Sequence, residues 1–163
     1  MDTSRSTQFF QVMLGQSPRA YCHVYGGMQY PQLTGIVLFF EALGGSLVFA
    51  EFVNLPVTGG NCAQDFFGFH IHEGASCSGT PDNEFANAMG HFNPYNCPHP
   101  EHLGDMPPLL GGKDGYAFTV FFTDKFTPRQ VAGRTVIVHR NPDDFTTQPS
   151  GNSGPMIACG TIF

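Results

Sequence analysis

Glycine and proline interrupt this chain so often that a helical bundle is excluded. The sequence contains 20 Gly and 13 Pro, and both residue types weaken helix interiors and favour turns. Between the turns lie short runs rich in β-branched and aromatic residues, which are typical of strands. These runs cover residues 20–25, 35–41, 47–53, 66–72, 116–122 and 135–139.

The spacing of these runs predicts an all-β protein. We expect an antiparallel Greek-key β-barrel or sandwich, immunoglobulin-like, with about eight strands. The length of 163 residues suits a single domain. Residues 1–18 are polar with scattered apolar residues and show no convincing amphipathic helix. They are expected to form a loosely ordered N-terminal arm before a single domain at 19–163.

Charge and hydropathy exclude several functions. A formal net charge of −6 makes nucleic acid an unsuitable partner. The sequence lacks the run of about 20 apolar residues that crosses a membrane. The first 20 residues do not resemble a signal peptide, which favours a cytoplasmic location. The alternative is an extracellular or periplasmic protein from which a leader has been removed.

Two long segments break the regular spacing of the strands. Residues 73–108 contain several histidines, and residues 140–155 contain Asp143 and Asp144. Loops of this length inside a compact domain are usually functional.

The pair His70 and His72 lies at the end of a predicted strand. Side chains two residues apart point to the same face, so both imidazoles could reach one metal ion. The alternative is a pair of surface histidines on an edge strand. His139 ends another predicted strand and could add a further nitrogen, and nitrogen-rich coordination suits Cu(II). His23 lies far from the others in the sequence and is expected to have no functional role.

A second group of potential ligands lies in the long segment 73–108. Three histidines and one aspartate would close a tetrahedral zinc site with no open position, as in structural metal sites. The alternative is a polar loop with scattered histidines. The four residues are His91, His99, His102 and Asp105.

At this point the sequence resembles the copper/zinc superoxide dismutases, from about Ala20 to the C-terminus. The resemblance rests on motifs that occur in the order of the family. They are Gly68-Phe69-His70-Ile71-His72-Glu73, Gly90-His91-Phe92-Asn93-Pro94, His102-Leu103-Gly104-Asp105, Gly133-Arg134-Thr135-Val136-Ile137-Val138-His139, Asp143-Asp144 and Ala158-Cys159-Gly160.

The resemblance implies one copper and one zinc ion in each chain, joined by the imidazole of His91. It implies that superoxide is the substrate, converted to oxygen and hydrogen peroxide. Asp143 is expected to hold the outer nitrogens of His70 and His99, and Cys77 and Cys159 to form a disulfide. The implied copper ligands, which are also the catalytic residues, are His70, His72, His91 and His139; the implied zinc ligands are His91, His99, His102 and Asp105.

The sequence departs from the family at the position of an arginine that lies beside the copper. Met156 stands there, so a charged contact with the substrate anion is lost. The stretch between Asp144 and Gly151 is short and uncharged, which also removes guidance of superoxide. Arg140 is the nearby candidate replacement. We therefore expect reduced efficiency, with a copper- and zinc-binding protein of little turnover as the alternative.

Met156 itself has two interpretations. A thioether near copper favours Cu(I), whereas an apolar side chain could simply fill the space. The remaining cysteines are also ambiguous: Cys62 and Cys97 could pair or remain free, and Cys22 is expected to be an unpaired core residue. Both a homodimer and a monomer remain open.

Overall fold

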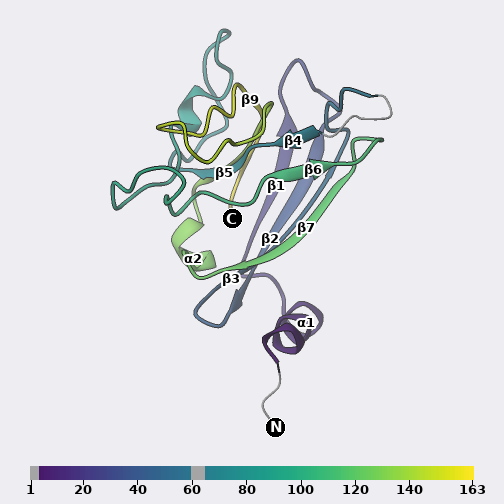
Figure 1. The fold of residues 1–163 in the computed structure, drawn as a ribbon, viewed down its shortest axis with the longest axis vertical. Coiled ribbons are helices and arrows are strands. Elements are labelled where there is room, and N and C mark those ends of the chain that lie inside the picture. The colour runs from purple at the N-terminus through teal and green to yellow at the C-terminus, as the bar shows by residue number, and fades with distance from the viewer. Residues whose placement is uncertain (1–3, 60–64) are drawn as a thin grey trace.

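The computed structural model describes residues 4–59 and 65–163. Within these residues nine strands form an antiparallel seven-stranded sheet, with the order β5-β8-β9-β1-β2-β3-β7, and a two-stranded sheet of β4 and β6 (Figure 1). The predicted all-β antiparallel fold is confirmed. The strands are β1 (Ala20–Gly26), β2 (Thr34–Ala42), β3 (Gly45–Val53), β4 (Asp65–Phe67), β5 (Phe69–His72), β6 (Leu109–Gly111), β7 (Ala117–Thr123), β8 (Thr135–His139) and β9 (Met156–Thr161).

The β2–β3 hairpin shows how the sequence sets the register of the sheet. Ala42 pairs with Gly45 across a two-residue turn. Leu43 and Gly44 have φ angles of 47° and 82°, as a tight turn with two left-handed residues requires. Inside the curved sheet the phenylalanine rings of Phe52 and Phe69 meet edge to face at 5.7 Å. Packed rings of this kind stabilise a core without leaving polar atoms to satisfy.

The predicted strand at 66–72 is in fact two strands in different sheets. β4 pairs with β6, whereas β5 pairs with β8. Gly68 separates them, and a Cβ atom there would meet the side chain of Ser153 at 2.8 Å. The close approach of the loop 140–155 therefore requires glycine and ends β4 before the His70 strand begins.

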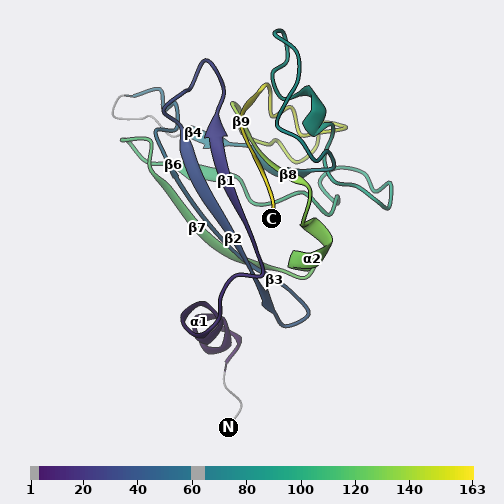
Figure 2. The same ribbon diagram turned by 180° about the vertical axis from the view of Figure 1, so that it is seen from behind.

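The expectation that the first 18 residues contain no amphipathic helix is wrong. Helix α1 spans Arg5–Gly15, and the side chain of Ser4 caps it by accepting from the N–H of Thr7. Its apolar face packs on the outer side of β2, β3 and β7, where Phe9 stacks on Phe122 at 4.9 Å. Figure 2 shows α1 beyond one end of the sheet. The domain boundary at residue 18 stays a prediction.

Two further helical turns lie in the connections between strands. They are η1 (Ala86–Ala88) and α2 (Pro128–Val131). Thr127 and Gln130 form a capping box at the start of α2. In the part of the chain that the structure describes, none of the helices has the length and hydrophobicity needed to cross a lipid bilayer.

The two long loops, 73–108 and 140–155, lie on the side of the sheet formed by β5, β8 and β9 (Figures 1 and 2). A disulfide joins Cys77 in the first loop to Cys159 in β9, which confirms the predicted bridge. Cys22 is a buried free thiol, as expected, and burial raises its pKa to about 12. Cys97 is also free, and Cys62 lies outside the described residues.

Candidate metal centre

The pairing of β5 with β8 brings three predicted ligands onto one face. His70 lies opposite Ile137, and His139 follows Ile137 by two residues, so His139 lies on the same face as His70 and His72. A β-bulge between Val138 and His139 turns the end of β8. The Nε2 atoms of His72 and His139 come within 3.2 Å of each other.

The free edge of β5 is covered by the loop that carries the remaining ligands. The N–H of Ile71 donates to the carbonyl of Gly104, and the N–H of Phe92 donates to the carbonyl of Ile71. A Cβ atom on Gly104 would lie 2.1 Å from the carbonyl oxygen of Ile71. Only glycine permits this approach, which places His91 and Asp105 beside the β5 histidines.

The result is two groups of potential ligands that share His91. In each group one ligand atom per residue lies within 4.8 Å of all the others. We call the first the four-histidine set: His70, His72, His91 and His139. We call the second the histidine–aspartate set: His91, His99, His102 and Asp105.

Asp105 holds the histidine–aspartate set together. Its Oδ1 atom lies 2.8 Å from Nδ1 of His91, and its Oδ2 atom lies 3.2 Å from Nδ1 of His99 and 3.3 Å from Nδ1 of His102. Burial opposes ionisation of Asp105, but the hydrogen bond with His91 outweighs it and lowers the pKa of the carboxyl group. Asp105 is therefore a carboxylate at neutral pH.

Asp143 connects the two sets from behind. Its Oδ2 atom lies 2.7 Å from Nε2 of His70, and its Oδ1 atom lies 2.9 Å from Nε2 of His99. Each imidazole therefore places a proton on its outer nitrogen and keeps a lone pair on the inner one. Burial would raise the pKa of Asp143, but the hydrogen bond from His70 is part of a group of contacts that lowers it.

Two further rings are oriented by backbone carbonyl groups. Nδ1 of His72 donates to the carbonyl of Met89 at 2.8 Å, and Nδ1 of His139 donates to the carbonyl of Gly154 at 3.1 Å. In both rings the lone pair then lies on Nε2, the atom that faces the other ligands.

The inner nitrogens show that this geometry fits metal ions. Nδ1 of His70 and Nε2 of His91 are buried without a hydrogen-bond partner. Leaving a buried polar atom unpaired costs free energy, and a metal ion bound by these lone pairs would remove that cost. His91 offers Nε2 to the four-histidine set and Nδ1 to the histidine–aspartate set, as an ion-bridging ring must.

The histidines of the first set are neutral at physiological pH. Burial lowers the pKa of His70 to about 4 and that of His139 to about 3. Burial also lowers the pKa of His72 well below its ordinary value. Metal ions bind neutral imidazole, so these rings do not have to release a proton at pH 7 before they coordinate.

The metal-free chain is expected to lose stability between pH 7 and pH 5. Unfolded histidines take up protons near pH 6.5, whereas His70 and His139 stay neutral in the folded chain until about pH 4 and 3. The unfolded state therefore binds more protons in this window. The free energy of unfolding should fall by up to about 2 kcal/mol for each histidine. Guanidinium denaturation of chelator-treated protein at pH 7, 6 and 5 measures the effect.

His139→Gln supplies the control for this pH dependence. The variant lacks one of the two titrating rings, so its stability should decrease less steeply as the pH falls. An unchanged slope would show that His139 is not neutral in the folded, metal-free chain.

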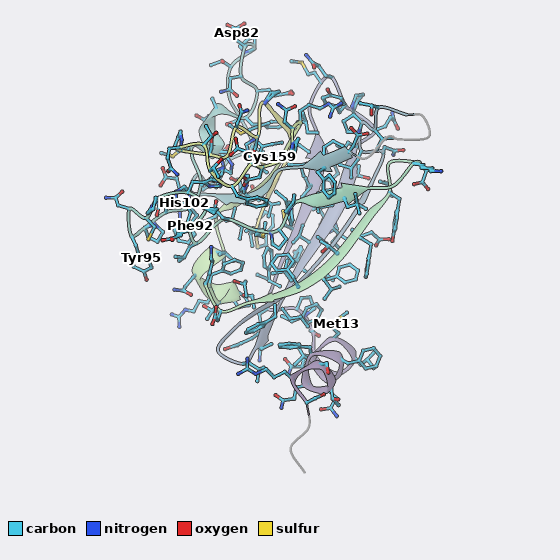
Figure 3. The ribbon with its side chains drawn as sticks, viewed as in Figure 1. Met13, Asp82, Phe92, Tyr95, His102 and Cys159 are labelled. Atoms are coloured by element: carbon cyan, nitrogen blue, oxygen red, sulfur yellow. A yellow bond between two sulfur atoms is a disulfide. The ribbon has the colours of Figure 1, made fainter. Side chains whose placement is uncertain are left out.

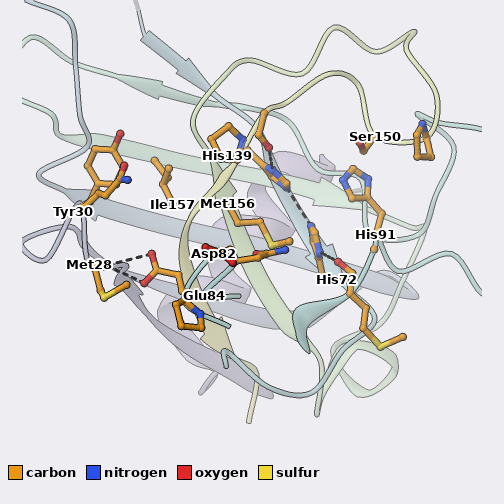
Figure 4. Close-up of a pocket in the computed structure, with 18 of the residues that line it drawn as sticks. Met28, Tyr30, His72, Asp82, Glu84, His91, His139, Ser150, Met156 and Ile157 are labelled. Carbon is orange, nitrogen blue, oxygen red and sulfur yellow. Dashed lines mark hydrogen bonds between the residues drawn. The ribbon is translucent and has the colours of Figure 1, made fainter. Parts of the chain in front are cut away.

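A cavity of about 720 Å³ opens over the four-histidine set. We call it the histidine pocket, because His72, His91 and His139 line it (Figure 4). Asp82 and Glu84 also line it, and Figure 3 places Asp82 at the outer tip of its loop. Among the described residues that line the pocket there is no lysine or arginine. Its charged side chains are therefore negative.

Arg140 does not supply the missing positive charge. Its guanidinium lies 4.0 Å from the carboxylate of Asp65 and 5.7 Å from the ring of Phe67, and Arg140 does not line the histidine pocket. The stretch after Asp144 contributes Pro149 and Ser150 to the pocket, neither of them charged. Met156 lies in the pocket between His139 and Asp82 (Figure 4).

The structure thus brings together the predicted ligands and Asp143. His23 lies on the outer face of β1 and is exposed. Sequence reasoning missed four residues of the pocket wall: Met28, Asp82, Glu84 and Met89. Met28 comes from the turn after β1, and no spacing in the sequence connects it to the histidines.

Comparisons with known proteins agree with this geometry. The family model described as copper/zinc superoxide dismutase matches residues 34–162. A copper/zinc superoxide dismutase of Deinococcus radiodurans is 36% identical over 112 residues, which cover 58% of this chain and 62% of that protein. The chain therefore spans only about three fifths of the length of this relative. A copper/zinc superoxide dismutase of Aquifex aeolicus is 35% identical, with 72% of this chain and 73% of the relative covered.

A solved structure extends the likeness to the whole fold. The copper/zinc superoxide dismutase from Brucella abortus is 27% identical and superposes with a TM-score of 0.73, covering 88% of this chain and 99% of that one. The family match covers most of the sequence, and the two ligand sets lie within it. This chain belongs to the copper/zinc superoxide dismutase family.

Proposed function

We propose that the chain binds copper at the four-histidine set and zinc at the histidine–aspartate set, and that it disproportionates superoxide there. The observation that carries the proposal is the position of His91, whose two ring nitrogens face the two sets. Four nitrogens suit copper, and three nitrogens with a carboxylate oxygen suit a closed zinc site. The relatives named above carry the same activity in their names.

When bound, copper supplies a one-electron redox couple, so that one superoxide is oxidised to oxygen and a second is reduced to peroxide with the uptake of two protons. The chain's own contribution is orientation and proton handling. Nε2 of His91 is buried and has no hydrogen-bond partner, so it is the atom at which a proton can be held for the peroxide product. Asp105 keeps that ring in place through Nδ1.

The rate is expected to be lower than a guided site would give. Met156 offers no positive charge to superoxide, and Asp82 and Glu84 add negative charge to the pocket. An anion that approaches this pocket is repelled, whereas positively charged clefts raise on-rates by roughly 10–1,000-fold. The same repulsion makes the salt dependence diagnostic.

Superoxide decay in the presence of metal-loaded protein should speed up as ionic strength rises. Salt screens the repulsion between superoxide and the pocket carboxylates. Pulse radiolysis with verified copper and zinc content measures the rate. A rate that falls with salt would contradict the repulsion, and decay no faster than that with metal-free protein would contradict the dismutase proposal.

Met156→Arg is expected to raise the rate by up to about tenfold, because it places a positive charge in the pocket. The matched control is Gln11→Arg, which adds the same charge at an exposed position on α1, far from the histidines. If both variants give the same rate, net charge and not the pocket determines superoxide capture.

A second candidate function is the holding of copper and zinc with little turnover. The apolar thioether of Met156 and the negative pocket favour it. Full metal loading combined with background-level superoxide decay would select this function over the enzyme.

A further inference from the structure

Three methionines line the histidine pocket: Met28, Met89 and Met156. Met28 and Met89 are 74% and 56% exposed, which is unusual for a side chain that is mostly buried in soluble proteins. The other methionines of the described chain serve different places, since Met13 packs under α1 and Met106 belongs to the core.

The backbone connects each of these methionines to the four-histidine set or to its neighbour. Met156 is the direct register partner of His139 between β9 and β8, so the two side chains are neighbours on one face. The carbonyl of Met89 accepts the hydrogen bond from His72. The two histidines concerned are those whose Nε2 atoms lie 3.2 Å apart.

Met28 is held over the same pocket by two contacts. The preceding residue, Gly27, donates its N–H to the carbonyl of Ile157 at 2.9 Å. The N–H of Met28 donates to the carboxylate of Glu84, with distances of 3.0 and 3.2 Å to its two oxygens. Figure 4 shows Met28, Glu84 and Met156 along one wall of the pocket.

The wall is therefore chemically selective. Thioethers are soft ligands that prefer Cu(I) to Zn(II) and to hard cations. Asp82 and Glu84 attract cations, and no lysine or arginine among the described lining residues opposes them. A substrate anion gains nothing from such a wall, whereas a monovalent copper ion gains both charge attraction and sulfur ligands.

We propose that the mouth of the histidine pocket is a docking site for Cu(I), in which the thioethers of Met28, Met89 and Met156 hold the ion before it passes to His72 and His139. The inference rests on the proposed copper site. No electron is transferred in this step: the ion remains Cu(I) and exchanges thioether sulfur for imidazole nitrogen.

The test uses zinc-loaded, copper-free full-length protein labelled with [methyl-13C]methionine under anaerobic conditions. Cu(I) is supplied as its bicinchoninate complex. We expect the methyl signals of Met28, Met89 and Met156 to shift on addition of Cu(I), while those of Met13 and Met106 stay in place. Loss of the chelate colour reports the rate of transfer to the protein.

The triple variant Met28→Leu, Met89→Leu, Met156→Leu conserves side-chain volume but removes the sulfur ligands. We expect it to take up Cu(I) slower by about tenfold or more, because it no longer concentrates the ion next to the histidines. Its zinc content and final copper content should match those of the unaltered chain. The matched control, Met13→Leu, should load at the original rate.

The outcomes separate the two proposals. Unshifted pocket methyl signals, or a triple variant that loads as fast as the control, would overturn the docking site even if one copper per chain is bound. Shifted methyl signals with no copper at the histidines would support the docking site and contradict the proposed copper site.

Discussion

Asp143→Asn is expected to weaken copper binding by about 10–100-fold, with a smaller loss at the zinc site. Asp143 supports both sets, because one carboxylate oxygen faces His70 and the other faces His99. An asparagine has almost the same shape, but it offers only one oxygen as an acceptor. One of the two histidines must therefore face an amide N–H group.

The surroundings of Asp143 decide which histidine this is. Oδ1 accepts from Nε2 of His99 and also from the backbone N–H of Phe145 at 2.7 Å. An asparagine oxygen satisfies both donors only in that position, so its NH2 group faces His70. Nε2 of His70 must then become the acceptor, and the proton moves to Nδ1. Nδ1 is the buried inner nitrogen that the proposed copper ion needs.

Copper and zinc affinities measured separately by chelator competition test this asymmetry. Asp144→Asn is the matched control, because Asp144 accepts from Thr146 and Thr147 on the exposed loop and contacts neither set. Equal losses of both metals in Asp143→Asn would show that the carboxylate acts only by holding the loop. Unchanged copper affinity would contradict the tautomer argument.

The parts of the centre that lie on strands or close behind glycine could be predicted from the sequence. His70 and His72 follow from the alternation of a strand, and the register of β5 against β8 adds His139. Gly104 marks the point where the ligand loop must approach β5 closely. Family resemblance was still needed to choose His91 as the shared ring and to pair Cys77 with Cys159.

Features that depend on contacts between distant segments could not be predicted. Helix α1 has weak local signals, and its position follows from the outer face of the sheet, including Phe122. The short strand β6 exists only because it pairs with β4. The direction of Arg140 is set by Asp65 and Phe67. The negative charge and the three thioethers of the histidine pocket likewise come from turns far apart in the chain.

Removing the disulfide, with Cys77→Ser and Cys159→Ser together, is expected to lower the free energy of unfolding of the metal-free chain by about 4–5 kcal/mol. The two cysteines are 82 residues apart, so their link removes a large amount of conformational freedom from the unfolded chain. Cys159 is also buried beside Phe85 and Ile137, where a serine hydroxyl is poorly accommodated.

The loss should also reach the metal sites, because the disulfide fixes the start of the loop that carries Met89 and His91 to β9. Chemical denaturation with and without bound zinc measures both effects. Cys97→Ser, which removes a free thiol at a partly exposed position, is the control and should unfold like the unaltered chain. If the double variant is as stable as this control, the fold of the loop is held by its contacts with β5 and by Asp105, and the disulfide contributes little.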